Sequence, residues 1–192
     1  KLLTDIVFMS TVGMQPILVH GGGKAITKAM NDSGLEPVWV HGRRYTDERT
    51  LTIAEHTLIN KINTPICNTL RDLGARAMGL HSLSSCVLMG KPLHLTGENG
   101  RKLDLGLVGQ VDTVNADLLK TLCGSGVIPV IATIATTRTG AKLNCNADTA
   151  AGKVAAAVQS EKLVVLSDTH GIRADREDPE SWISTVDESQ IS

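Results

Sequence analysis

The chain has 192 residues, a length that fits one ordinary domain with a sizeable core. Its 19 lysines and arginines nearly cancel its 20 aspartates and glutamates, so bulk charge gives no reason to expect a nucleic acid or an acidic membrane as a partner. The cysteines Cys67, Cys86, Cys123 and Cys145 have no metal-ligand spacing, which favours a reduced, cytoplasmic chain without a bound metal. No leader-like segment and no membrane-length apolar run is found, so we expect a soluble protein.

The first half of the chain is predicted to alternate helices and strands, from hydrophobic spacing and from glycines at helix ends. In chain order these elements are a helix over 2–9, a strand at 17–19, a helix over 24–33, a strand at 38–40 and a long helical stretch over 47–74. The strand at 38–40 would complete a β-α-β unit. Pro65 is expected to kink or divide the long helical stretch.

The second half begins with short strand-like segments and returns to alternation. Predicted in order are strands at 77–80, 86–89, 93–95 and 107–111, a surface loop or hairpin turn over 96–102, a helix over 115–122 capped by Asn115, a strand at 127–133, a turn over 136–142, a helix over 148–160 and a buried strand at 162–166. Aromatic residues make up only 2% of the chain, so the core must be aliphatic. The pattern predicts an α/β fold with a mainly parallel central sheet and helices on both faces.

The run His20-Gly21-Gly22-Gly23 is the strongest functional signal, because a short apolar strand stops there and a helical pattern begins. Glycines let backbone N–H groups approach an anion, and the following helix directs its positive end to the same place. A tight structural turn is the alternative. The loop fits neither common phosphate motif: Leu18 and Ala25 break a Walker A pattern, and Ile26 breaks a dinucleotide fingerprint.

Arg44 follows a predicted strand and precedes a helix, in the run His41-Gly42-Arg43-Arg44-Tyr45-Thr46-Asp47. Its planar guanidinium can hold a carboxylate through two parallel hydrogen bonds. A solvated arginine beside a Thr or Asp helix cap is the alternative.

Two further motifs stand at predicted strand ends, the usual ligand position in an open α/β sheet. Asn144 and Asn146 are two apart on an extended segment, so both amides can face one ligand, and Asp148 follows at the turn into a helix. Asp148 could instead be simply the N-cap of that helix. In the second motif, Ser167 and Asp168 precede Gly171, an arrangement that can hold a ribose and a base edge or can be a plain turn.

In order and spacing these motifs resemble the amino acid kinase superfamily, and within it most closely the acetylglutamate kinase family. The resemblance rests on Pro16-Ile-Leu-Val-His-Gly-Gly-Gly, Gly42-Arg-Arg-Tyr-Thr-Asp-Glu, Val108-Gly-Gln-Val, Val114-Asn-Ala-Asp-Leu-Leu, Gly126-Val-Ile-Pro-Val-Ile, Asn144-x-Asn-Ala-Asp-Thr-Ala-Ala-Gly and Leu166-Ser-Asp-x-x-Gly-Ile. It implies the three-layer sandwich of that superfamily, as a single domain over residues 1–192 that is incomplete at both ends.

The resemblance implies transfer of the γ-phosphoryl group of ATP, with Mg²⁺, to the side-chain carboxylate of N-acetyl-L-glutamate in arginine biosynthesis. A carboxylate is already ionised near neutral pH, so catalysis needs positioning and charge neutralisation and no general base. The implied roles are Gly22, Gly23, Arg44, Asn144 and Asn146 for the substrate, Gly21, Ser167, Asp168 and Gly171 for the nucleotide, and Asp148 as the catalytic residue that orients two lysines. A homo-oligomer in the cytoplasm is also implied.

The chain departs from the family at both ends. Family members begin with a strand ending in Lys-x-Gly-Gly and carry a second lysine near the C-terminus, and neither has a counterpart here. Taken alone, the chain is therefore expected to bind ligands poorly and to have little kinase activity. Two other functions remain open: a non-catalytic amino-acid-binding domain, as in acetylglutamate synthase, and a sister kinase that acts on aminoadipate or another acidic amino acid.

Overall fold

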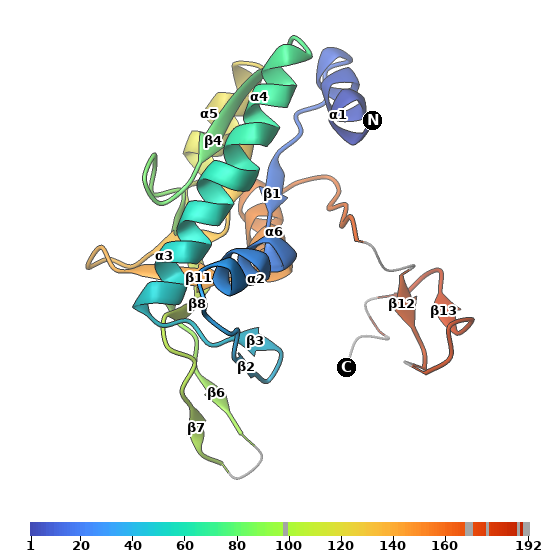
Figure 1. Ribbon diagram of the computed structural model, residues 1–192. Coiled ribbons are helices and arrows are strands. Elements are labelled where there is room, and N and C mark those ends of the chain that lie inside the picture. The colour runs from blue at the N-terminus through green and yellow to red at the C-terminus, as the bar shows by residue number, and fades with distance from the viewer. Residues whose placement is uncertain (98–99, 168–170, 176, 188, 190–192) are drawn as a thin grey trace. The chain divides into compact units, whose positions relative to one another are not determined.

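A computed structural model describes residues 1–97, 100–167, 171–175, 177–187 and 189 (Figure 1). The chain divides into two units, residues 1–162 and residues 163–192, and each is described by itself. The first unit carries every motif of the predicted site except the nucleotide segment that follows residue 166.

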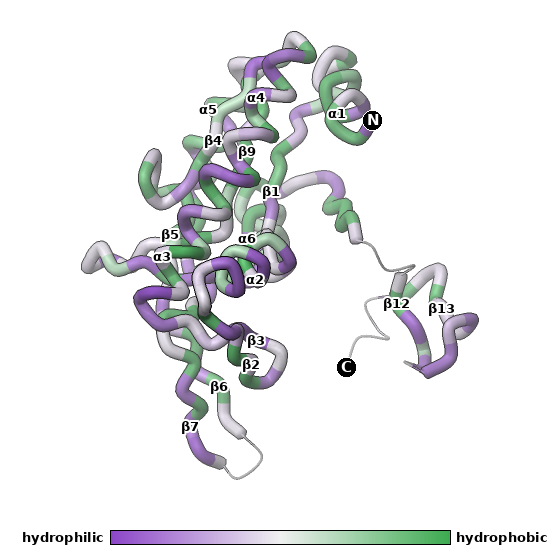
Figure 2. Tube along the Cα trace, in the orientation of Figure 1, coloured by the Kyte–Doolittle hydropathy of each residue, from purple (hydrophilic) through white to green (hydrophobic). Residues whose placement is uncertain are grey.

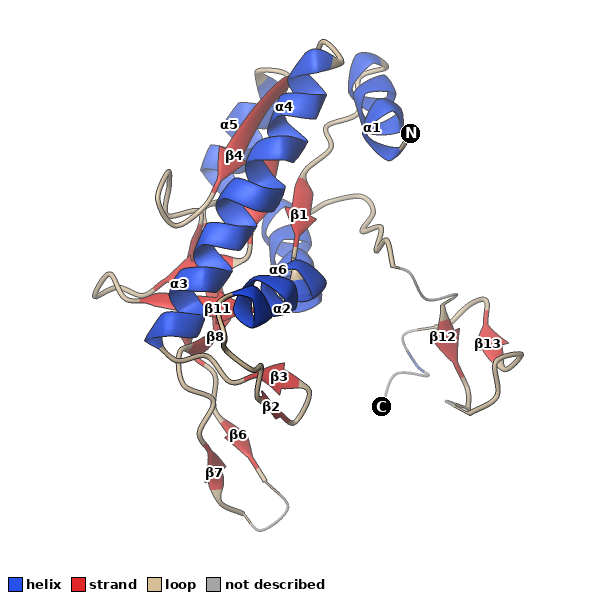
Figure 3. Ribbon diagram, viewed as in Figure 1, coloured by secondary structure: helices blue, strands red, loops and turns tan. Residues whose placement is uncertain are grey.

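In the first unit, helical stretches are separated by single strands or by runs of consecutive strands, the longest of which covers residues 76–114 (Figure 3). Its helices are α1 (Leu2–Thr11), α2 (Gly23–Asp32), α3 (Glu48–His56), the π-helix η1 (Thr57–Asn63), α4 (Thr64–Asp72), α5 (Ala116–Gly124) and α6 (Ala147–Val158). Its strands are β1 (Leu18–His20), β2 (Trp39–Val40), β3 (Arg43–Arg44), β4 (Arg76–Leu80), β5 (Leu88–Pro92), β6 (Leu95–Thr96), β7 (Lys102–Leu103), β8 (Val108–Val114), β9 (Val127–Ala132), β10 (Ile134–Thr136) and β11 (Lys142–Cys145).

The central sheet is parallel, with the strand order β1-β9-β4. β9 lies in the middle, and Leu18 of β1 pairs with its Val130, while Gly79 of β4 pairs with the same residue on the other side. β9 is buried from Ile128 to its end, as a continuous β-branched run predicts for a strand covered on both faces. The predicted strand at 127–133 is therefore confirmed.

Helices cover both faces of this sheet, which gives the three-layer sandwich predicted from the sequence. On one face, Leu119 of α5 and Val154 of α6 pack with Ile131 of β9. On the other face, Ile6 of α1 and Leu70 of α4 pack with the β9 residues whose side chains alternate with Ile131, namely Ile128 and Val130. Figure 2 shows hydrophobic colour along β1 and β9, where these two layers meet.

A second sheet of four strands closes on itself in the order β10-β11-β8-β5. β10 and β11 form a hairpin around Gly140, and β11 pairs in parallel with β8, so Asn144 lies opposite Val108. β6 and β7 form the predicted hairpin. The strand predicted at 38–40 forms only a short hairpin with β3, so the proposed β-α-β unit is wrong. Its apolar residues, including Trp39, are largely exposed, and they pair locally instead of joining the central sheet.

The long helical stretch after Asp47 is one continuous run of α3, η1 and α4 (Figure 3). Asp47 is its N-cap, because the carboxylate accepts a hydrogen bond from the N–H of Thr50 at 2.7 Å. Pro65 is the second residue of α4 and has no N–H to donate to the preceding turn, and the seven-residue π-helix precedes α4. The irregularity expected near Pro65 is therefore a wider helical turn.

The second unit contains one short hairpin, β12 (Ile172–Arg173) with β13 (Trp182–Ile183). The buried strand predicted at 162–166 is wrong, because residues 163–166 form no strand and are 50% to 71% exposed. An apolar run indicates that a segment can form a strand. A strand must also pair with the edge of a sheet, and among the described residues the segment 163–166 pairs with no such edge. None of the helices that the structure describes has the length and apolar character needed to cross a bilayer.

Candidate active site

The glycine loop lies where β1 ends, at the carboxyl edge of the parallel sheet. Gly21 and Gly22 connect β1 to α2, and Gly22 takes the N-cap position without any side chain to satisfy the first N–H groups of the helix. Among the described residues, the N–H groups of Gly22 and Gly23 have no hydrogen-bond partner. The loop therefore has the free donors at a positive helix end that an anion cradle needs.

Close packing on two sides of this loop leaves no room for side chains at Gly21 and Gly22. A Cβ atom on Gly21 would lie 2.9 Å from Cβ of Ala147, the first residue of α6. A Cβ atom on Gly22 would lie 2.5 Å from Cδ1 of Ile62 and 2.9 Å from Cδ2 of Leu58, both in η1. The glycines thus permit a close approach of η1 and α6, and α6 brings its first turn, with Asp148, up to the loop.

Arg44 is buried beside the loop, with 6% of its surface exposed. Its Nη2 atom donates to the carbonyl oxygen of Gly23 at 3.1 Å and to Oγ1 of Thr27 at 2.7 Å, and Nη1 donates to Sδ of Met30 at 3.3 Å. The guanidinium carbon also lies 4.6 Å from the centre of the Trp39 ring, within cation–π range. Burial lowers the pKa of Arg44 from its usual value. The alternative of a solvated arginine is excluded.

The Asn-x-Asn-x-Asp motif joins β11 to α6. Nδ2 of Asn144 donates to Oγ1 of Thr46 at 3.2 Å. Asn146 is the N-cap of α6, since its Oδ1 accepts from the N–H of Thr149 at 3.0 Å and from its hydroxyl at 2.6 Å. Asp148 is exposed in the first turn, where its charge stabilises the helix end. The alternative that Asp148 is itself the N-cap is therefore wrong.

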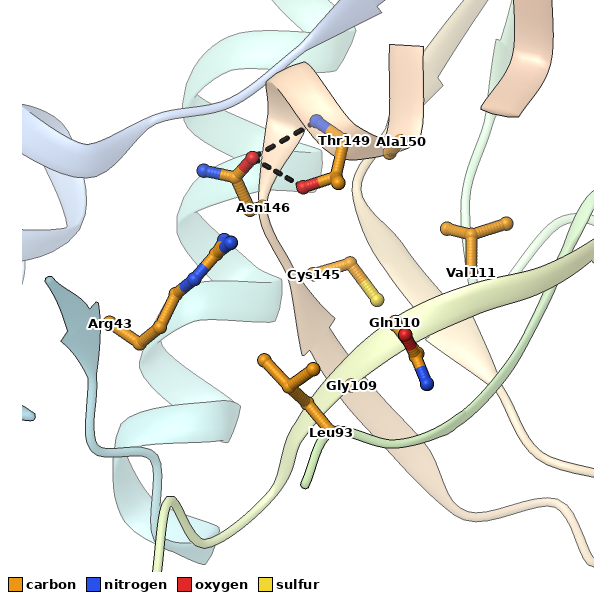
Figure 4. A pocket seen from close by; sticks show the side chains of 9 residues that line it. All are labelled: Arg43, Leu93, Gly109, Gln110, Val111, Cys145, Asn146, Thr149 and Ala150. Atoms are coloured by element: carbon orange, nitrogen blue, oxygen red, sulfur yellow. Dashed lines mark hydrogen bonds between the residues drawn. The ribbon is translucent and has the colours of Figure 1, made fainter. Parts of the chain in front are cut away.

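A small pocket of about 60 Å³ opens beside Asn146 (Figure 4). It is lined by Arg43, Leu93, Gly109, Gln110, Val111, Cys145, Asn146, Thr149 and Ala150. The Arg43 side chain reaches from β3 toward Asn146, and within the described residues its guanidinium makes no hydrogen bond or ion pair. Burial raises the pKa of the Cys145 thiol to about 11, so the thiol is uncharged near neutral pH. With one cation, amide groups and no carboxylate, the pocket suits a polar or anionic part of a small ligand.

The segment predicted to hold a nucleotide belongs to the second unit. Ser167 is exposed there. Gly171 has a φ of 119°, a left-handed conformation that favours glycine. Asp168 lies outside the described residues. The nucleotide-binding roles of these three residues, like that of Gly21, stay predictions.

Three side chains that adjoin the predicted site were not predicted from the sequence, namely His20, Thr46 and Asn63. Thr46 has no exposed surface and supports Asn144. Nε2 of His20 lies 3.0 Å from Nδ2 of Asn63 in η1. A histidine that ends a strand directly before three glycines was an available signal. No pattern in the sequence indicated a role for Asn63, because only the folded chain brings it to the loop.

A parallel sheet between two helical layers, with a glycine loop at its carboxyl edge, defines an α/β protein with a small-ligand site at its strand ends. The profile of the Amino acid kinase family matches residues 1–192, so the chain belongs to this family. The resemblance seen in the sequence is thereby confirmed, together with its fold.

The chain is similar to three known proteins. An acetylglutamate kinase from Symbiobacterium thermophilum is 41% identical over 191 residues, which cover 99% of this chain and 65% of that relative. The crystal structure of smu.665 from Streptococcus mutans UA159 has a TM-score of 0.80 at 26% identity and covers 90% of this chain and 68% of that one. N-acetylglutamate synthase from Neisseria gonorrhoeae, complexed with coenzyme A and N-acetyl-glutamate, has a TM-score of 0.78 and covers 95% of this chain and 40% of that one. At 21% identity, the last comparison shows the shared fold alone.

Proposed function

We propose that this chain is the substrate-holding part of an acetylglutamate kinase of arginine biosynthesis. In the proposed reaction, an oxygen of the side-chain carboxylate of N-acetyl-L-glutamate attacks the γ-phosphorus of ATP. The bond to the bridging oxygen breaks, and the products are an acyl phosphate and ADP. The observation that carries the proposal is the convergence on one loop of two distant motifs: Arg44 donates to the carbonyl of Gly23, and Ala147 of α6 packs against Gly21.

In this proposal the glycine loop holds the transferred group. The free N–H groups of Gly22 and Gly23 donate to oxygens of the phosphoryl group and of the attacking carboxylate, both of which carry negative charge. The carboxylate is ionised near neutral pH, so no side chain has to remove a proton. The loop is held by packing on η1 and α6, so its donors are aimed before the reaction starts.

Arg44 and the two asparagines are proposed to hold the rest of the acidic substrate. Nε of Arg44 has no acceptor among the described residues and can donate to a carboxylate. Asn144 extends from β11 on the same side, next to Thr46. Asn146 borders the pocket that also contains Arg43, which suits the amide or the second carboxylate of N-acetylglutamate. Recognition of both carboxylates would separate this substrate from neutral amino acids.

Asp148 is proposed to organise lysine ammonium groups that neutralise the phosphoryl charge. Ser167, Asp168 and Gly171 are proposed to line the nucleotide side of the site. Within the described ranges, no group of three or more His, Cys, Asp or Glu side chains could hold a metal ion. Mg²⁺ commonly binds through nucleotide phosphates and one or two carboxylates, so the site fits a metal brought by ATP. That Mg²⁺ would supply further charge neutralisation.

The two alternative functions have less support. The effector-binding function, as in acetylglutamate synthase, is supported only by the similarity in fold to the Neisseria structure. The 41% identical relative is named a kinase, and Asp148 points toward catalysis, because a domain that only binds an effector has no need of a lysine organiser. A sister kinase for aminoadipate would need room for one more methylene group.

The test is a substrate comparison with the full-length protein. We expect ADP formation that depends on N-acetylglutamate, and an acyl phosphate that hydroxylamine traps as a hydroxamate. Turnover of N-acetylaminoadipate at a higher kcat/KM would favour the sister kinase. Binding of N-acetylglutamate without any ADP formation would show an effector domain and would overturn the proposal.

A further inference from the structure

The imidazole of His20 is held between the glycine loop and the π-helix by hydrogen bonds at both ring nitrogens. Nδ1 lies 3.1 Å from the carbonyl oxygen of Gly21, and Nε2 lies 3.0 Å from Nδ2 of Asn63. Burial lowers the pKa of His20, against a smaller opposite effect of the bond to Gly21. The ring is therefore neutral near pH 7, with one nitrogen that donates and one that accepts.

Asn63 determines which ring nitrogen carries the hydrogen. Its Nδ2 also lies 2.9 Å from the carbonyl oxygen of Val130, which can only accept, so the NH₂ group must face that oxygen. Its Oδ1 accepts from the Cys67 thiol at 3.7 Å. The second Nδ2 hydrogen then points to Nε2 of His20, which must accept it. The ring hydrogen is therefore on Nδ1 and is donated to Gly21.

Packing fixes the Asn63 side chain in this orientation. The residue is 1% exposed and ends the π-helix, a widened turn of a kind that is frequent at functional sites. Gly79 of β4 has no side chain at the point where Asn63 passes, and a Cβ atom there would overlap Oδ1 of Asn63. Leu58 and Ile62 of the same π-helix press against Gly22. One segment therefore supports both the imidazole and the backbone of the loop.

The bond from His20 sets the direction of the next N–H group. A trans peptide is planar, so the C=O of Gly21 and the N–H of Gly22 point in opposite directions. Because the imidazole holds the Gly21 carbonyl, the Gly22 N–H is turned away from His20. That N–H is one of the two loop donors without a partner among the described residues.

We propose that His20 and Asn63 are positioning residues for phosphoryl transfer: Asn63 keeps the imidazole in the Nδ1–H tautomer, and the imidazole aims the Gly22 N–H at the transferred group. This inference rests on the proposed function, because it assigns that N–H to the phosphoryl group. Neither side chain itself touches the substrate.

The first test replaces His20 in two ways in the full-length protein. In His20→Asn the amide nitrogen can take the place of Nδ1 and still donate to Gly21, whereas in His20→Gln the amide lies near the place of Nε2. We expect kcat to fall about 10- to 100-fold in His20→Gln, less than the loss of a whole transition-state donor. The KM for the acidic substrate should change less than about threefold. His20→Asn should recover most of the lost kcat.

The second test uses a matched pair in the π-helix. Asn60 also places its side-chain nitrogen on a histidine ring, at 3.2 Å from Nδ1 of His56, but on the exposed side of the helix. We expect Asn63→Ala to lower kcat as His20→Gln does, and Asn60→Ala to leave it unchanged. A kcat within threefold of wild type in both His20→Gln and Asn63→Ala would overturn the proposal.

A third measurement uses the wild-type protein, so it tests the proposed tautomer of His20 even if the variants fail to fold. Imidazole ¹⁵N chemical shifts of the wild-type protein near neutral pH should show the Nδ1–H tautomer at His20. An Nε2–H tautomer or an imidazolium there would overturn the inference. Failure of the proposed function looks different, because the wild-type protein would then form no ADP with N-acetylglutamate.

Discussion

The side-chain amide of Asn144 donates to the hydroxyl of Thr46, and this bond joins the two motifs proposed to hold the acidic substrate. Thr46 has no exposed surface, and its hydroxyl donates in turn to the carbonyl oxygen of Arg44 at 2.9 Å. One buried hydroxyl thus connects the backbone at Arg44 with the amide of Asn144. The positions of both proposed contacts depend on it.

Thr46→Val keeps the shape of this side chain and removes both hydrogen bonds. We expect the free energy of unfolding to fall by about 1–3 kcal/mol, because buried groups lose their partners. The KM for N-acetylglutamate should rise as Asn144 loses its support. Urea unfolding and steady-state kinetics of the full-length protein check this. Thr52→Val, on the exposed face of α3, is the control, and an unchanged KM in Thr46→Val would contradict the prediction.

Arg44→Ala should raise the KM for N-acetylglutamate more than it lowers kcat, because the proposed role of Arg44 is to hold the substrate. It should also reduce the free energy of unfolding by about 1–3 kcal/mol, since Gly23 and Thr27 lose a buried partner. Arg43→Ala is the control for stability and should stay within about 0.5 kcal/mol of wild type. Equal destabilisation by the two substitutions would contradict the prediction that the buried hydrogen bonds of Arg44 stabilise the fold.

Asp148→Asn should lower kcat far more than it raises the KM. The chain contains a matched control, because Asn-Ala-Asp begins both α5 and α6, with Asn115 and Asn146 as N-caps. Asp117→Asn removes the same first-turn charge from α5, so each variant should lose about 0.3–1 kcal/mol of stability. Only Asp148→Asn should affect kcat. A fully active Asp148→Asn enzyme would refute its catalytic role.

Gly22→Ala should destabilise the folded protein, because its Cβ would lie 2.5 Å from Ile62 and 2.9 Å from Leu58. We expect a loss of about 1–3 kcal/mol, the usual range for overpacking. Gly23→Ala is the comparison, since a Cβ there meets nothing within 4 Å and alanine favours a helix. Thermal unfolding of the two variants measures this difference. A loss of stability in Gly23→Ala as large as that in Gly22→Ala would contradict the proposed effect of close packing at Gly22.

The stability of the fold should depend on pH through His20 and His81, whose pKa values are both lowered, mainly by burial. Below the ordinary value of 6.5, the unfolded chain binds protons that the folded chain does not. The free energy of unfolding should therefore be highest above pH 6.5 and fall as the pH decreases through the lowered pKa values. Denaturant midpoints on either side of pH 6.5 measure this. His20→Asn should flatten the slope, and an unchanged slope would contradict the assignment.

Local signals were sufficient for most of the helices and strands of the first unit. Asp47 and Asn115 accept hydrogen bonds from the first turn of their helices, as capping residues should, and their position depends only on a few neighbours. The buried β-branched run of β9 showed a central strand. Glycines after an apolar strand showed the loop between β1 and α2. These features are encoded within a few residues of each other.

Pairing partners could not be predicted from the same signals. The apolar residues at 38–40 and at 163–166 looked alike in the sequence, yet the first forms a local hairpin and the second forms no strand. The burial of Arg44 depends on Thr27, Met30 and Trp39, which the fold brings to it. The contact between His20 and Asn63 also needs the turn of η1. Such contacts join distant segments, and no local pattern records them.

The central position of β9 also has a consequence for synthesis of the chain. Among the described strands, β1 and β4 both pair with β9 and with no other, although β9 is made long after them. On the ribosome, β1 and β4 would therefore stay without a partner until residue 132 has emerged. The glycine loop connects β1 to α2, so it can take its final shape only after β9 has emerged and paired with β1. The anion site would therefore be among the last parts of the unit to form.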